Sequence, residues 1–224
     1  MPIRVLLLWL LYCLNPLPVL AAPQLYTRGV ETGPALALAP ADLRWLWEKR
    51  HLNLGVVGRD NPPFDMLGTG QAYEGISAEY ASVLAEKLGL EVRLSLFETY
   101  DAAFASLRKG TVDLVSSVTA QQAQDAKLRL SSPYIVDQPL LLASERFVSG
   151  NSASPRLLAV EGYRPLALLQ HNYPNARIQL HPTPYSALAA LQLGEAELFL
   201  GNALSSRYLL ARGQLPGLEW VDQP

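Results

Sequence analysis

Apolar residues recur with two different periods in the first half of the chain, which predicts alternating strands and helices. Alternating or continuous apolar stretches predict strands at 51–58, 91–97 and 112–118. Apolar residues three and four positions apart predict helices at 75–88 and 100–109. Gly89 and Gly110 are suitable stops for these helices, and Thr99 is a suitable N-cap for the second. The order strand, helix, strand, helix, strand predicts a parallel sheet with helices on its faces.

The second half has the same kind of pattern. Strands are expected at 157–161 and 177–181, a helix over 165–172, and a further helix that Thr183 caps and that ends near Leu193. Before the first strand, 23–39 is expected to be extended, and 41–50 is expected to be a short helix carrying Leu43, Trp45, Leu46 and Trp47. Between the halves, 131–143 is long enough to cross from one lobe to another, and 147–154 is expected to be a surface turn.

One segment of the first half recurs 84 residues later, in the order helix, glycine, acidic residue and strand. The matched pairs are Ala103 with Ala187, Phe104 with Leu188, Leu107 with Leu191, Gly110 with Gly194, Asp113 with Glu197 and Leu114 with Leu198. This pattern is common in α/β folds, so it indicates either a chance recurrence or two similar lobes, each with its own parallel sheet. Asp113 and Glu197 lie where strands begin, so we expect them to serve the starts of those strands rather than a ligand.

Composition excludes several classes of protein. The chain has 224 residues, of which 50% are hydrophobic and 17% charged, so it can bury enough surface to fold. The balance of 18 basic and 20 acidic residues argues against nucleic acid or an anionic membrane as partner. Cys13 is the single cysteine, which excludes an internal disulfide framework and a multi-cysteine metal site. Three scattered histidines and the lack of a phosphate loop or nucleophile elbow predict no catalytic residue, no metal and no cofactor.

Residues 1–21 have the order of a secretory signal peptide. Arg4 supplies a positive charge, 5–14 is a short apolar run, and Ala21 and Ala22 are small. The apolar run is shorter than the roughly 20 residues that span a bilayer. We therefore expect cleavage after Ala21 and a mature chain in the periplasm. The alternative is an uncleaved N-terminal anchor.

Three stretches of the chain carry a family resemblance. They are the strand, Pro-Pro-Phe turn and Gly-led helix of 54–90, the Gly110-Thr111-Val112-Asp113 start of a strand, and the Leu130-Ser131-Ser132-Pro133-Tyr134 crossover. Their order and spacing resemble the family 3 bacterial solute-binding proteins, the Venus-flytrap type, over about 38–221. Residues 38–46 and the stretch Gly201-Asn202-Ala203 with Tyr208-Leu209-Leu210 are similar to the periplasmic flytrap domains of BvgS-type hybrid sensor histidine kinases.

The resemblance implies an α/β, two-lobed periplasmic-binding-protein-like fold. The expected parts are a signal peptide at 1–21, an extended leader at 22–40, lobe 1 at 41–137, lobe 2 with the crossover at 138–217, and the start of a return to lobe 1 at 218–224. Because the family's chain closes lobe 1 with a further strand and helix, we expect this chain to lack that closing C-terminal segment.

The implied function is a non-catalytic, extracytoplasmic solute-binding or sensor domain of a two-component signalling protein. Its expected partners are a small polar molecule, or no ligand at all, and further domains of a sensor kinase. The alternative is a free periplasmic substrate-binding protein that delivers a small polar solute to an ABC importer.

Two departures from the family pattern bear on the ligand. Amino-acid-binding members have an arginine nine residues before the crossover proline, and an aspartate directly after a glycine of lobe 2. The corresponding residues here are Gln124 and Asn202. Glutamine cannot replace the bidentate, charge-assisted bonds of arginine. An α-amino acid is therefore not expected to be held in the family's usual way.

The expected ligand contacts lie at the carboxyl ends of strands, between the lobes. The residues chosen are Asp60, Phe64, Ser117, Thr119, Gln124, Tyr163 and Asn202, with Ser116 and Gly162 beside them. These mainly neutral groups suit a small polar molecule, and equally suit a cleft that holds no ligand and rests in one conformation. A ring packed beneath its turn is the alternative for Phe64, and bonding to nearby backbone groups is the alternative for Ser116, Ser117 and Thr119.

Overall fold

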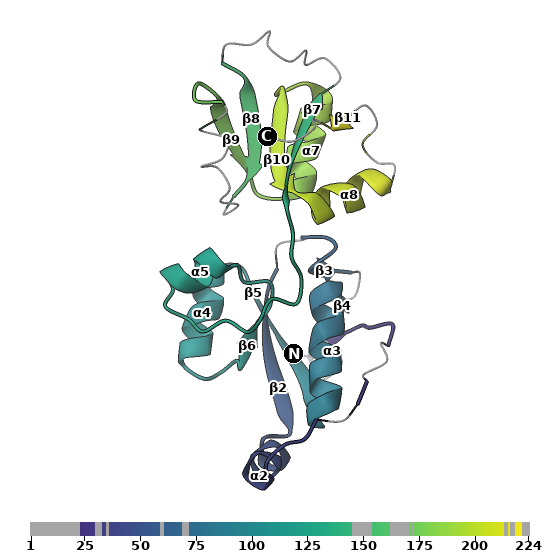
Figure 1. Ribbon diagram of the computed structural model, residues 1–224, viewed down its shortest axis with the longest axis vertical. Coiled ribbons are helices and arrows are strands. Elements are labelled where there is room, and N and C mark those ends of the chain that lie inside the picture. Colours follow the sequence, from purple (N-terminus) through teal and green to yellow (C-terminus); the bar gives the residue numbers. More distant parts are fainter. Residues whose placement is uncertain are drawn as a thin grey trace, which may run out of the picture.

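Figure 1 shows two lobes joined by a single extended crossover in the part of the chain that is described. The structure is a computed structural model, and it describes residues 23–29, 33–34, 36–58, 61–68, 72–144, 154–161, 171, 173–212, 215 and 218–220. The signal peptide expected at 1–21 and most of the helix and turn expected at 165–172 and 147–154 lie outside these residues.

A parallel sheet of three strands forms the centre of lobe 1. Its order is β5-β2-β6, made by Glu91–Phe97, His51–Val57 and Leu114–Val115. The expected strands at 51–58 and 91–97 are thereby confirmed. The strand expected at 112–118 is wrong in length, because only two residues pair with β2. The chain leaves the sheet at Ser117, whose φ of 52° is a left-handed conformation that no strand adopts.

Helices α3 (Ile76–Leu88) and α4 (Tyr100–Arg108) lie on opposite sides of this sheet (Figure 1). The Thr99 hydroxyl caps α4 by accepting the Ala102 amide at 3.3 Å, as the sequence predicts. α3 ends at Gly89, which has a φ of 66°.

The buried face of α3 differs from the face that its large apolar residues indicate. The residues it buries are Ser77, Ala78, Ala81 and Ala85. Tyr80 and Leu84 remain 51% and 37% exposed. Small side chains let the helix backbone lie close to the sheet, so the large ones are displaced to the outside.

The N-terminal residues attach to lobe 1 at two places. β1 (Gln24–Leu25) pairs in parallel with β4 (Ala72–Glu74), which also pairs with β3 (Met66–Leu67). Helix α2 (Pro40–Lys49) confirms the short helix expected at 41–50, but it buries only Leu46. Its two tryptophans remain exposed, with Lys49 and Arg50 over their rings.

Lobe 2 contains a five-stranded mixed sheet in the order β11-β7-β10-β8-β9. The strands are Leu218–Trp220, Pro139–Ser144, Leu198–Asn202, Arg156–Val160 and Arg177–His181. β8, β9 and β10 are mutually parallel, whereas β7 is antiparallel to both β10 and β11. Helices α7 (Pro184–Leu193) and α8 (Ala203–Ala211) cover one face, where Leu142, Leu158, Leu188, Leu191 and Phe199 form the core.

The recurrence at a spacing of 84 residues corresponds to a repeated structural unit. The order β5-β2-β6 in lobe 1 matches β9-β8-β10 in lobe 2, and the strands within each set of three are parallel to one another. Thr99 and Thr183 cap the matched helices α4 and α7. Gly110 and Gly194 follow them with φ of 73° and 79°. The interpretation as two similar lobes is therefore confirmed, but the sheet of lobe 2 is mixed and not purely parallel as expected.

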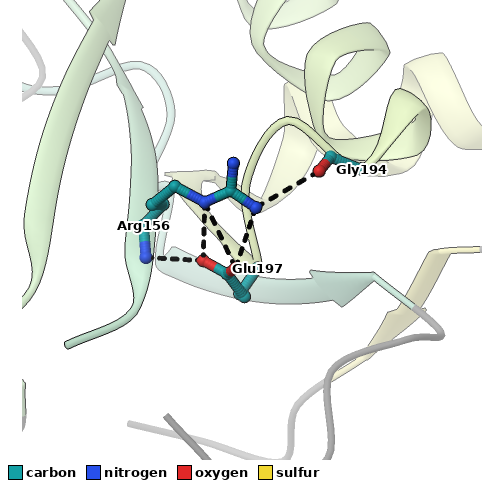
Figure 2. A network of polar contacts seen from close by, with 3 residues as sticks. All are labelled: Arg156, Gly194 and Glu197. Atoms are coloured by element: carbon teal, nitrogen blue, oxygen red, sulfur yellow. Dashed lines mark hydrogen bonds and ion pairs between the residues drawn. The ribbon is translucent and has the colours of Figure 1, made fainter. Parts of the chain in front are cut away.

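The paired acidic residues of the repeat hold the starts of strands, as expected. In lobe 1, Asp113 accepts the Asn53 amide at 2.8 Å and the Lys49 ammonium at 2.7 Å. In lobe 2, Glu197 accepts the Arg156 amide at 2.6 Å and its guanidinium at 2.9 Å (Figure 2). The hydrogen bond from the Arg156 side chain is the main reason that the pKa of Glu197 is lowered. Each carboxylate thus ties together the starts of two neighbouring strands.

Candidate functional site

The facing ends of the two lobes are built from the carboxyl ends of their parallel strands. In Figure 1, β2 runs from α2 toward lobe 2, and β10 ends at α8, beside lobe 1. A direct hydrogen bond joins the lobes here: the Ser205 hydroxyl on α8 donates to Asn61 Oδ1 at 3.2 Å. Ser205 is fully buried. The lobes are therefore in contact at their facing ends.

The turn after β2 packs against the amino end of α3 and hydrogen-bonds to its first amides. The Ile76 and Ser77 amides donate to the carbonyl oxygens of Pro63 and Phe64 at 3.0 and 3.1 Å. Gly75 permits this approach, because a side chain there would collide with the same two carbonyls. The first amides of α3, which would otherwise attract an anion, are used within the protein.

A buried carboxyl lies beside this turn. Asp65 is 6% exposed, and its Oδ1 accepts the Tyr73 hydroxyl at 2.5 Å. Burial raises the pKa of Asp65, while the hydroxyls of Ser117 and Tyr73 act to lower it. Burial, and then the charge of Asp65, raise the pKa of Tyr73, which keeps its hydroxyl protonated as a donor.

Hydroxyl groups connect this carboxyl to the crossover. Ser77 Oγ lies 2.8 Å from Ser117 Oγ and 3.0 Å from the Tyr134 hydroxyl. The Tyr100 hydroxyl donates to the Ser117 carbonyl at 3.0 Å. These bonds hold Ser117 in its left-handed conformation, so they determine where the chain turns after β6.

On the lobe 2 side, the crossover packs against the amino end of α8 and hydrogen-bonds to its first amides. Asp137 Oδ1 accepts the Leu204 amide at 3.1 Å, and the Gln138 carbonyl accepts the Ala203 amide at 2.8 Å. Asn202 Oδ1 accepts the Ser205 amide at 2.9 Å. Burial raises the pKa of Asp137, and the bonds from the backbone act to lower it. The carboxylate of Asp137 thus lies where the helix dipole would attract a ligand anion.

The structure describes five of the seven residues selected from the sequence. Phe64 is buried at 7% exposure, and Ser117 is bonded as described above. Thr119 caps the short helix α5 (Ala120–Asp125) in a capping box with Gln122, and Gln124 is exposed on the same helix. Asn202 caps α8. Asp60, Gly162 and Tyr163 lie outside the described residues.

Sequence reasoning missed five polar residues at the facing ends. They are Asn61, Asp65, Tyr73, Asp137 and Ser205. Asn61 and Asp65 flank the Pro-Pro-Phe turn, so their position next to a selected residue was an available signal. Nothing in the local sequence of Tyr73 or Ser205 indicates a partner, because each partner comes from another element.

A groove of about 490 Å³ lies elsewhere, on the outer side of lobe 1. It is lined by the N-terminal residues Pro23–Leu25, by α3 and by the start of β5. None of the selected ligand residues lines it. Among the described residues, no cluster of three or more groups is suited to a metal, and no helix is both long and apolar enough to cross a membrane.

The chain is similar to part of two known sensor proteins. It is 34% identical to the virulence sensor protein BvgS of Bordetella pertussis over 200 residues, which cover 87% of this chain and 16% of that protein. It is 24% identical to the sensor protein EvgS of Escherichia coli over 194 residues, which cover 83% of this chain and 16% of that one. The chain therefore spans only about a sixth of these relatives.

Solved structures show the same likeness. The crystal structure of the B. pertussis BvgS periplasmic domain superposes with a TM-score of 0.74 and 32% identity, covering 89% of this chain and 39% of that one. The BvgS periplasmic VFT2 domain superposes with a TM-score of 0.70 and 21% identity, covering 84% and 83%. The model of the bacterial extracellular solute-binding proteins, family 3, matches residues 54–198. With both lobes, the crossover and the internal repeat in place, the chain belongs to this solute-binding family.

Proposed function

We propose that this chain is a non-catalytic, extracytoplasmic sensor domain, whose lobes transmit their relative position to further domains of a transmembrane signalling protein. The observation that carries the proposal is the likeness to BvgS, which extends through both lobes at about a third identity. A signal peptide at 1–21 would direct the mature chain to the periplasm.

The hydrogen bond between Ser205 and Asn61 would stabilise one relative position of the two lobes, and a change in that position would be the signal. It joins residues 144 positions apart, one in each lobe. A ligand, or the rest of the protein, can bias a sensor only through different affinities for two arrangements. Breaking this bond changes the balance between joined and separated lobes without altering either sheet.

The ligand we propose is a small, neutral, polar molecule, or none. The first amides of α3 and α8 are already bonded within the protein. The carboxylate of Asp137 stands at the start of α8. An anionic ligand group at the start of α3 or α8 would therefore find these amides already bonded, and at α8 it would also meet a like charge.

We also propose that lobe 1 accepts a further strand along β6. Within the described residues, β6 pairs only with β2, and Leu114 is 39% exposed. An open edge of this kind favours pairing with another strand. A longer form of the protein that supplies the family's closing segment should melt at a higher temperature, and equal melting temperatures would contradict this part of the proposal.

The sensor role is tested with a chimera in which this chain replaces the matching segment of BvgS, with a reporter for signalling output. Asn61→Ala and Ser205→Ala should each change the output in the same direction. They should also increase the radius of gyration of the isolated chain in small-angle scattering. Ser154→Ala is the matched control, because that hydroxyl bonds within lobe 2.

Two results would contradict the proposal. One is a folded chimera in which Asn61→Ala and Ser205→Ala behave like Ser154→Ala in both measurements. The other is a chain that restores uptake of a small solute by an importer and leaves the reporter unchanged, which would support the transport role instead.

A further inference from the structure

The crossover carries Asp137 past the amino end of α8, at the facing ends of the lobes. Asp137 Oδ1 accepts the Leu204 amide at 3.1 Å, across 67 positions of the chain, and the Gln138 amide at 2.9 Å. Ser205, the next residue of α8, donates its hydroxyl to Asn61 of lobe 1. The carboxylate is therefore bound directly beside the hydrogen bond that joins the lobes.

This contact differs from ordinary helix capping in two ways. α8 already has a cap of its own, because Asn202 Oδ1 accepts the Ser205 amide. In addition, Asp137 Oδ2 is buried and has no hydrogen-bond partner within the described residues. Burying an oxygen in this way costs free energy, which the bonds to Oδ1 must offset. The side chain is thus held like a carboxylate ligand, by backbone amides at one of its two oxygens.

The electrostatic environment favours an anion at this position. Leu204 belongs to the first turn of a nine-residue helix, whose dipole gives this end a positive potential. Burial raises the pKa of Asp137, while backbone amides and then the charge of Arg207 act to lower it. The groups that favour the ionised side chain would equally attract the carboxylate of another molecule.

We propose that the start of α8 is a carboxylate-binding subsite, which the protein occupies with its own Asp137. The subsite consists of the Leu204 and Gln138 amides, within the field of the helix and of Arg207. When the side chain of Asp137 is removed, a small free carboxylate such as acetate binds in its place. An uncharged molecule of the same shape does not.

In the native chain the side chain of Asp137 acts as a tethered ligand. A short tether gives a bound group an effective concentration in the millimolar range, so a free carboxylate at micromolar concentration does not displace it. Asp137 thereby takes the place of a ligand's carboxylate, which agrees with a ligand that is neutral or absent. Acetate binding to the subsite is independent of the sensor role, because it is measured on the isolated chain without a signalling output.

Thermal unfolding of Asp137→Ala in sodium acetate tests the proposal, with sodium chloride at the same ionic strength as the reference. For a dissociation constant on the order of 10 mM, about 100 mM acetate should raise the melting temperature by about 3–6 °C. Acetamide, the neutral counterpart of acetate, should have no such effect.

The wild-type chain and Asp125→Ala are the controls for this measurement. The wild-type subsite is already occupied, and the carboxylate of Asp125 bonds to the Gln121 side chain of α5. Both should melt at nearly the same temperature in acetate and in chloride. The proposal would be overturned if acetate stabilised all three chains equally, or if it failed to stabilise Asp137→Ala.

A second variant keeps the test decisive if Asp137→Ala does not fold. Asp137→Asn preserves the shape of the side chain, but a neutral amide oxygen accepts a weaker hydrogen bond than a carboxylate. Acetate should therefore compete for the Leu204 amide more readily in this variant than in the wild-type chain. The amide resonance of Leu204 in nuclear magnetic resonance spectra reports this competition, with the Ser186 amide of α7 as internal control. An equal response of Leu204 in Asp137→Asn and in the wild-type chain would also overturn the proposal.

Discussion

Replacing Tyr73 with phenylalanine removes one hydroxyl from the buried cluster of lobe 1 and leaves the ring in place. That hydroxyl donates to Asp65 at 2.5 Å, and Tyr73 is fully buried. Asp65 itself is 6% exposed, so water has little access to supply a replacement donor. The substitution therefore leaves a buried carboxyl oxygen without its bonding partner.

The expected cost follows from this geometry. Leaving a buried hydrogen-bonding group without its partner costs about 1–3 kcal/mol, so we expect a loss of about 2 kcal/mol in the free energy of unfolding. For a chain of this size that corresponds to a melting temperature about 4–8 °C lower. The loss should be smaller in acid, where Asp65 is protonated and its bond to a hydroxyl is one between neutral groups.

Urea and thermal unfolding followed by circular dichroism, at neutral and acid pH, measure this cost. Tyr80→Phe is the matched control, because Tyr80 is 51% exposed and its ring packs at a tilt against Tyr134 with a centroid separation of 4.6 Å. Its change should stay within about 0.5 kcal/mol. The reasoning is refuted if Tyr73→Phe costs no more than Tyr80→Phe, or if its cost increases in acid.

Three further predictions concern the pH dependence, a helix cap and the ligand. Because burial raises the pKa of Asp65 above its ordinary 3.8, the folded state holds that proton more tightly, and stability should fall as pH rises from about 4 toward the raised pKa. Asp65→Asn, whose amide can donate to the buried Ser116 hydroxyl, should remove this dependence of stability on pH in urea titrations. An unchanged dependence would contradict its assignment to Asp65. Thr183→Ala removes the cap of α7 and should lower the free energy of unfolding by about 1 kcal/mol in the same assay, and an unaltered midpoint would show that the cap contributes nothing. Titration calorimetry with the common amino acids should give no measurable heat, and micromolar binding would show that Gln124 and Asn202 are not the deciding differences.

Local sequence patterns were sufficient where a structure depends on neighbours along the chain. The strands expected at 91–97 and 177–181 match β5 and β9 residue for residue. The caps at Thr99 and Thr183 were also predictable, because a cap bonds to amides two or three residues away. The buried face of α3 was not, because contact with the sheet selected its small residues over its large ones.

The candidate site was less predictable than the fold. Thr119 and Asn202 were selected as ligand contacts, and the structure shows both as helix caps. The helices that they cap, α5 and α8, are short and lack a clear apolar period, so the sequence did not indicate them. Asp65 was missed, although it directly follows Phe64, because its hydrogen-bond partner Tyr73 comes from β4.

Sequence by itself determined the alternation of strands and helices, the repeated unit with its threonine caps and glycine stops, and the family resemblance. These features depend on periods and motifs within a few tens of residues. Only the tertiary structure decided which polar groups meet at the facing ends. The bond between Asn61 and Ser205 spans 144 residues, and its existence depends on how the crossover orients the two lobes. No local pattern encodes that orientation, because it results from packing between elements that are distant in the chain.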